Sequence, residues 1–205
     1  MNRLPTLFIG ILFTFAFAWV GLVVLPYAQI GRLQPEVNAD TGDIFPPTPS
    51  GLADAGQKVY AANGCVYCHS QQIRPEESGS DLARGWGSRR TVPRDYIRQS
   101  KVFLGTMRTG PDLSDAGFRF PDAKWHHLHL YNPRSLNAYS IMPSFKYLYI
   151  TRKIVGQKSE DALDLKGDDA PPLGYEVVPS EDAKALAAYL ISLNRRYPLK
   201  EAPEK

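Results

Sequence analysis

The chain has 205 residues, a formal net charge of +3 at pH 7 and a pI near 8.8. This length suits one modest domain with appended segments. So mild a positive charge, without a long run of basic residues, gives no reason to expect a nucleic-acid partner. The composition is ordinary except at the N-terminus, so the informative features are local motifs.

An apolar segment comes first. No charged residue occurs between Leu4 and Gly31, and residues 5–25 are almost wholly aliphatic or aromatic. A helix of about 20 residues spans the hydrocarbon core of a bilayer. A cleaved signal peptide, the alternative, has an apolar core of only about 7–15 residues followed by a small-x-small cleavage site. We therefore expect residues 1–30 to be a retained transmembrane anchor.

Residues 31–50 are rich in proline and glycine, which predicts a semi-extended linker before a domain at residues 51–198. A helix is expected over residues 52–62, with Ser50 as its cap and Asn63-Gly64 at its end. Helical spacing places four residues on its apolar face: Leu52, Ala55, Gly56 and Val59.

The next motif is Cys65-Val66-Tyr67-Cys68-His69, which contains the only two cysteines of the chain. C-x-x-C-H is typical of c-type haem attachment. Two thiols one helical turn apart can each add across a haem vinyl group, and the following imidazole can bind the iron. A redox-active disulfide would be expected in a βαβ surround, and a zinc site would need a second ligand pair, so both alternatives are weaker.

Several arginines follow the motif, with Trp86 among them. A cluster of this kind is either a solvated surface or a set of partners for haem propionates, because guanidinium groups pair with carboxylates. The arginines concerned are Arg74, Arg84, Arg89, Arg90, Arg94 and Arg98.

Two further segments carry candidate residues. Gly110-Pro111-Asp112-Leu113 is on its own only a turn signal. Met142-Pro143 lies well downstream, and a thioether opposite the histidine is common in electron-transfer haems. The chain has three methionines. A buried methionine is usually core filler, and we expect this role for Met107, three residues before Gly110. Met142 is the candidate ligand for the iron.

Residues 125–132 predict a short helix that Pro133 ends. It holds His126, His127 and His129, but no acidic or cysteine neighbours at metal-ligand spacing. We expect these histidines to pack, to hydrogen-bond or to touch the edge of a haem.

Residues 153–179 are charged and contain many glycines and prolines, so we expect a polar surface insertion there. Ser180 should cap a last helix, followed by a frayed tail at residues 199–205. Its apolar stripe is Leu186, Tyr189, Leu190 and Leu193.

The order of C-x-x-C-H, Gly-Pro-x-Leu, Met-Pro and a terminal helix resembles class I mono-haem cytochromes c. The resemblance implies a mainly α fold: one N-terminal transmembrane helix followed by a class I cytochrome c domain. It also implies that the Pro111 carbonyl accepts a hydrogen bond from His69 and that Leu113 packs on the haem. The first and last helices would cross where Gly56 meets Tyr189.

Longer stretches are more specific. Residues 63–75, 108–113 and 129–134 and the Met142 segment closely resemble subunit II of cbb3-type cytochrome c oxidases, a likeness that covers the anchor and roughly residues 55–150. This implies one covalent haem c held by Cys65 and Cys68 and ligated by His69 and Met142. It implies no catalytic residue in this chain.

The same resemblance implies partners and a location. Electrons would pass to the haem b of a catalytic haem-copper oxidase subunit, which reduces oxygen and pumps protons, with a further c-type cytochrome subunit in the complex. The haem domain would be periplasmic, on a single-pass anchor in a bacterial inner membrane with its N-terminus in the cytoplasm. A mono-haem subunit of a nitric oxide reductase and a free membrane-tethered electron shuttle are the alternatives.

Overall fold

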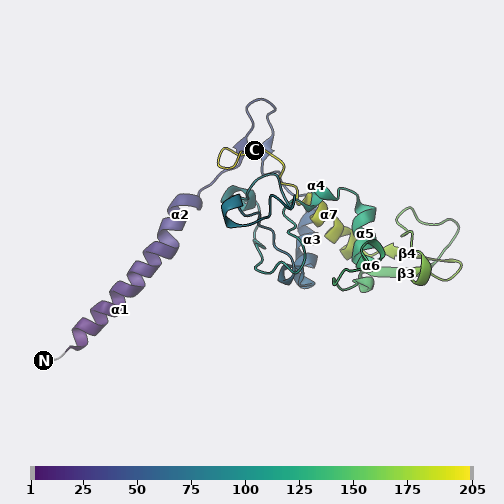
Figure 1. Ribbon diagram of the computed structural model, residues 1–205, viewed down its shortest axis with the longest axis horizontal. Coiled ribbons are helices and arrows are strands. Elements are labelled where there is room, and N and C mark those ends of the chain that lie inside the picture. Colours follow the sequence, from purple (N-terminus) through teal and green to yellow (C-terminus); the bar gives the residue numbers. More distant parts are fainter. Residues whose placement is uncertain (1–2, 204–205) are drawn as a thin grey trace. The chain divides into compact units, whose positions relative to one another are not determined.

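The computed structural model describes residues 3–203. The chain divides into two compact units. The first consists of Met1–Pro46 with Val92–Ser100, and the second of Pro47–Thr91 with Lys101–Lys205. Figure 1 labels the helices and strands of both.

The first unit begins with a continuous apolar helix. It comprises α1 (Leu4–Trp19), a π-helical turn η1 (Val20–Val24) and α2 (Leu25–Ile30). Within residues 3–203 it is the one helix long and apolar enough to cross a membrane. Pro26 accounts for the wider turn, since a proline lacks an N–H and its ring collides with the carbonyl four residues earlier.

The segment predicted as a linker contains a small antiparallel hairpin. Its strands are β1 (Glu36–Val37) and β2 (Ile44–Phe45). The Asn38 side chain accepts a hydrogen bond of 2.9 Å from the backbone N–H of Asp40, and Gly42 has a φ of 75°. An Asx turn and a glycine in the left-handed region are the features that reverse a chain tightly.

Two arginines of residues 92–100 hold this hairpin segment. Arg98 Nε donates to the Pro46 carbonyl at 2.7 Å, and Arg94 Nη1 donates to the Gln34 carbonyl. The segment begins with the 3₁₀ turn η4 (Pro93–Tyr96). Main-chain carbonyls that would otherwise need water are thus satisfied by guanidinium groups.

The second unit is organised around the crossing of α3 (Gly51–Ala62) and α7 (Glu181–Ser192). A Cβ atom at Gly56 would lie 1.9 Å from the Ala185 carbonyl oxygen and 2.7 Å from the Tyr189 Cβ. Only glycine permits this approach, which confirms the crossing expected at Gly56 and Tyr189. The predicted caps are also confirmed. The Ser50 side chain accepts a hydrogen bond from the Ala53 N–H, and the Ser180 side chain accepts one from the Ala183 N–H.

The buried face of α3 differs from the predicted one. Ala53, Gly56 and Tyr60 are buried, whereas Leu52 is 48% exposed. The Tyr60 ring meets the Tyr189 ring edge-on at 5.3 Å, and this large contact turns the helix by about one position relative to the aliphatic pattern. The predicted stripe of α7 is confirmed, since all four of its residues are buried.

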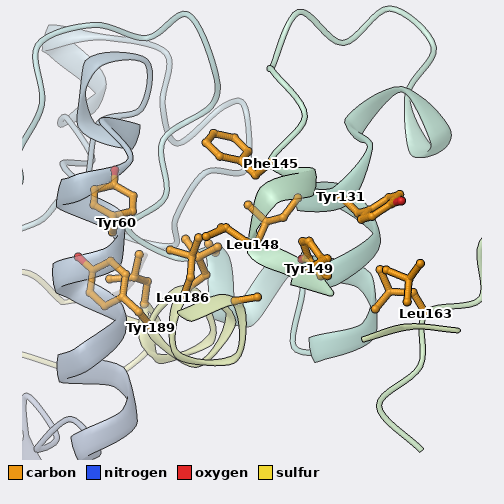
Figure 2. Packing of buried hydrophobic residues seen from close by; sticks show 14 of the residues in the cluster. Tyr60, Tyr131, Phe145, Leu148, Tyr149, Leu163, Leu186 and Tyr189 are labelled. Atoms are coloured by element: carbon orange, nitrogen blue, oxygen red, sulfur yellow. The ribbon is translucent and has the colours of Figure 1, made fainter. Parts of the chain in front are cut away.

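The remaining elements continue the core away from this crossing. Figure 2 shows the core running from Tyr60 and Tyr189 through Leu186 to Tyr131, Tyr149 and Leu163. The elements are α4 (Ala116–Arg119), α5 (Ala123–Tyr131), α6 (Pro133–Leu136), β3 (Tyr149–Lys153), β4 (Tyr175–Pro179) and the 3₁₀ turns η2 (Cys65–Tyr67), η3 (Glu76–Ser78), η5 (Lys146–Leu148) and η6 (Gly167–Asp169).

Residues 153–179 are more than a surface insertion. β4 pairs with β3 in an antiparallel hairpin, and Val177 and Val178 are only 2% and 6% exposed. Leu163, in the loop between the strands, is also buried. The high density of charges hides these few apolar positions, which supply one end of the core. The expected fold class is confirmed: one apolar N-terminal helix precedes a helix-rich domain.

Candidate haem-binding site

The two cysteines and the histidine share one tight turn after α3. Gly64 has a φ of 69°, which ends the helix and starts η2. The backbone N–H groups of Cys68 and His69 both donate to the Cys65 carbonyl, at 3.1 and 3.0 Å. Both cysteines are free thiols, one half-buried and one exposed, and burial raises the pKa of Cys65 to about 11.

The His69 ring is held by Pro111. Its Nδ1 atom lies 2.8 Å from the Pro111 carbonyl oxygen. Because a carbonyl only accepts, Nδ1 carries the proton and donates, which leaves a lone pair on Nε2. Burial lowers the pKa of His69, although the hydrogen bond to Pro111 partly opposes the shift. A neutral imidazole with an oriented Nε2 is the form that binds iron.

Close backbone packing brings Pro111 to this position. The Gly110 N–H donates to the Cys68 carbonyl at 2.9 Å, and the Leu113 N–H donates to the Ser70 carbonyl at 2.8 Å. A Cβ atom at Gly110 would lie 2.3 Å from the Cε1 atom of His69. The glycine is therefore required so that the chain can pass beside the imidazole.

Sequence reasoning missed the buried polar network behind this turn. The Asp112 side chain is fully buried and accepts hydrogen bonds from Ser70 Oγ and from the Gln72 N–H, the latter at 2.7 Å. Arg108 donates to Asp81 Oδ1 at 2.7 Å and to Ser70 Oγ at 2.9 Å. An acidic residue in a turn is normally exposed, and only its position next to Pro111 hints at this role.

The two methionines differ in environment. Met142 is half-buried and packs against the hydrophobic core together with Cys65 and Leu113. Met107 is 55% exposed, so its predicted role in core packing is wrong. Cys65, Leu113 and Met142 thus all pack against the hydrophobic core, whereas Met107 does not.

Some arginines of the 74–98 cluster have structural partners. Arg89 Nε donates to the Tyr197 carbonyl at 3.1 Å, and Arg90 Nη2 donates to the Glu201 carbonyl at 2.8 Å. Leu199 and Ala202 are 2% and 4% exposed. The tail expected to fray is thus partly buried, and these two arginines hold the backbone of the C-terminal segment.

The three histidines of α5 have individual packing roles. His126 Nε2 lies 2.8 Å from the Phe120 carbonyl oxygen, and His127 Nδ1 lies 3.2 Å from the Tyr149 hydroxyl. The His129 ring stacks on Trp125 at 4.9 Å. Within residues 3–203, the side chains of His, Cys, Asp and Glu form no group of three that could hold a metal ion.

The residues present fit a haem c. They comprise two free thiols, a neutral imidazole and a thioether beside a hydrophobic core. In addition, Arg119 Nε and His129 Nδ1 are buried without a hydrogen-bond partner in the described part of the chain. Unpaired polar atoms of this kind suit the anionic edge of a haem.

Comparison with known proteins agrees with this donor set. No curated protein matches the chain. The family described as "Cytochrome C oxidase, mono-heme subunit/FixO" matches residues 2–167, which include both cysteines, His69, Pro111 and Met142. The match favours an oxidase subunit over a nitric oxide reductase subunit or a free shuttle. The chain therefore belongs to the FixO family, the mono-haem cytochrome c subunits of cbb3-type cytochrome c oxidases.

Proposed function

We propose that Cys65 and Cys68 would hold one haem c covalently and that His69 and Met142 would bind its iron. The observation that carries this assignment is the His69–Pro111 hydrogen bond, which presents Nε2 of a neutral ring next to two free thiols. When bound, the haem supplies a reversible one-electron carrier whose potential is raised by methionine ligation.

The other residues act on this ligand set. The Pro111 carbonyl keeps the proton on Nδ1 of His69 and fixes the plane of the ring. Leu113 and Met142 pack against the apolar core, and an apolar surround would tune the potential of a haem by limiting solvent. If His69 and Met142 both bound the iron, no position would remain for oxygen, and this chain would relay electrons without being the catalyst.

The site of oxygen chemistry then lies in a partner. Family membership implies other oxidase subunits. We infer that electrons pass from this haem to the haem b of the catalytic haem-copper subunit, beside a further c-type cytochrome subunit. The helix over residues 4–30 would be retained as a single-pass anchor in a bacterial inner membrane, with the N-terminus cytoplasmic and the haem domain periplasmic.

Purification from the native membrane tests this function. The chain should co-purify with a large polytopic subunit that carries haem b, and it should keep its own haem after acid–acetone extraction, because thioether bonds resist extraction. Intact mass should include residues 5–25. Recovery of the red chain alone would indicate a shuttle, and a mature chain that begins near Gln29 would show that the helix is a cleaved signal.

A further inference from the structure

One side chain contacts the loop around Met142 at three points. Arg134 Nη1 donates to the carbonyls of Ser140 and Met142, at 3.4 and 3.3 Å, and Nη2 donates to Ser144 Oγ at 3.1 Å. These partners lie before, at and after the methionine. Because a guanidinium is planar and its donors are fixed, it restrains the whole methionine loop, residues 140–144.

The backbone of Arg134 is itself fixed by Asn132. The Asn132 side-chain oxygen accepts from the Arg134 N–H at 3.2 Å and so caps the one-turn helix α6. The Asn132 carbonyl accepts from Ser135 Oγ at 2.7 Å. These bonds set the direction in which the Arg134 side chain leaves the helix.

The segment between β3 and β4 contributes Asp169 to this set of contacts around the methionine loop. Asp169, in η6, accepts hydrogen bonds from Asn132 Nδ2 and from Lys146 Nζ, the latter at 2.6 Å. Its side chain is only 14% exposed, and Lys146 lies over the Tyr131 ring at 5.1 Å. Asn132 precedes the methionine loop and Lys146 follows it. One carboxylate therefore joins the two ends of the segment that contains Met142.

We propose that Asp169 and Arg134 are positioning residues for Met142, and that residues 153–179 brace the methionine loop through Asp169. The inference rests on the proposed role of Met142 as an iron ligand. A methionine–iron bond is weak enough for the loop to open and close around it. Each restraint on the loop makes the open form rarer, because opening then breaks charge-assisted hydrogen bonds as well.

Imidazole binding measures this opening. In the oxidised full-length chain with its haem attached, in detergent, imidazole replaces the thioether only when the loop opens. At saturating imidazole, the loss of the near-infrared sulfur-to-iron band gives the opening rate. Asp169→Asn keeps the shape of the side chain and removes its charge. Arg134→Lys keeps the charge and removes the planar guanidinium group that donates to several partners at once. Each should raise the opening rate about tenfold, the effect of losing one charge-assisted hydrogen bond.

The matched control is Asp164→Asn. Asp164 lies in the same segment, is 79% exposed and pairs only loosely with Lys166, at 3.7 Å. It should bind imidazole at the wild-type rate. A haem stain and thermal unfolding establish that each variant is folded and loaded.

The possible outcomes distinguish the positioning role of Asp169 and Arg134, the brace, from the proposed role of Met142 as an iron ligand. Wild-type opening rates in both Asp169→Asn and Arg134→Lys overturn the brace, even if those variants unfold at a lower temperature, since the contacts would then be merely structural. An equal rise in Asp164→Asn overturns it as well, because any charge loss in the segment would suffice. If the wild-type protein lacks the sulfur-to-iron band, Met142 is not the ligand, and the proposed ligation fails together with the brace.

Discussion

The Nδ1 atom of His69 and the carbonyl oxygen of Pro111 lie 2.8 Å apart, although the two residues are 42 positions apart in the chain. The contact depends on the backbone of residues 110–113 running alongside residues 68–70. Any change that separates these two segments should therefore alter the imidazole before it alters the fold. This makes the haem itself a reporter of the local packing.

Gly110→Ala tests that relationship. The added methyl group would meet the His69 ring at 2.3 Å, so the ring or the 110–113 backbone must move. We expect a weakened His69–Pro111 bond, which makes the imidazole a poorer donor and raises the reduction potential. Potentiometric titration of the haem measures this. Gly51→Ala is the control, since a methyl group there has no neighbour within 4 Å; an unchanged potential in Gly110→Ala would contradict the prediction.

Covalent attachment is tested by removing the thiols. The wild-type chain should stain for haem peroxidase activity after denaturing electrophoresis, and Cys65→Ser/Cys68→Ser should not, because it leaves no cysteine to form a thioether. The single variant Cys68→Ser should stain weakly through its remaining bond. A colourless wild-type band would exclude a covalent haem.

Replacement of the proposed sixth ligand should change the potential in a known direction. Met142→His should keep the iron six-coordinate but lower its potential, since imidazole stabilises the oxidised state more than a thioether does. A fall of about 200 mV would disfavour reduction by about three powers of ten, at 59 mV per factor of ten. Met107→Leu is the matched control and should leave the potential unchanged, because Met107 is exposed. The reverse pattern would assign the ligand to Met107.

Because α3 and α7 cross closely at Gly56, replacing this glycine should lower the free energy of unfolding. Gly56→Ala places a methyl group 1.9 Å from the Ala185 carbonyl oxygen, so the helices must separate. Overpacking of this kind costs about 1–3 kcal/mol. Chemical denaturation followed by far-ultraviolet circular dichroism measures the loss. Gly51→Ala, in the same helix, should be close to neutral, and equal losses in the two variants would argue against the crossing as the cause.

His127 should make the fold sensitive to acid. Burial lowers its pKa from 6.5 to about 4. Between these values the unfolded chain binds a proton that the folded chain does not, so the free energy of unfolding falls as the pH drops from 6.5 to 4. The slope from this group is at most about 1.4 kcal/mol per pH unit. His127→Gln should flatten the dependence measured by thermal unfolding across this range; an identical profile in the variant would show that other groups cause it.

The sequence predicts the haem-binding residues better than it predicts the buried residues that hold them in place. Cys65, Cys68 and His69 could be recognised because their spacing follows from haem chemistry and is local. Gly110-Pro111 alone is only a turn signal, and the role of Pro111 is predicted from the resemblance to class I cytochromes c. The burial of Asp112 could not, because it results from bonds to residues about 40 positions away. Similarly, aliphatic periodicity predicts that α3 has an apolar face but does not locate it, since the Tyr60–Tyr189 contact decides the rotation of the helix.

The same distinction applies to residues 153–179. Charge and glycine content correctly indicate a segment that is largely exposed, but they conceal the buried residues Leu163 and Val177. Val177 pairs with Thr151 of β3, and the Leu163 N–H donates to the Val177 carbonyl. The tail is a second example. Leu199 is buried, and Arg89 and Arg90 donate to backbone carbonyls of the C-terminal segment, whereas the sequence alone assigns these arginines to solvent or to the haem. Long-range partners, and not local pattern, determine these positions.

Because α3 packs against α7, part of the core can form only after the C-terminal helix has been synthesised. Gln71, two residues after His69, bonds to Tyr189 of α7, which lies 118 positions later in the chain. At 5–20 residues per second, α7 follows the motif by roughly ten seconds. During that interval Cys65 and Cys68 belong to a chain whose core has no closing helix. The turn that carries the two thiols is therefore made well before the contact between Gln71 and Tyr189 can form.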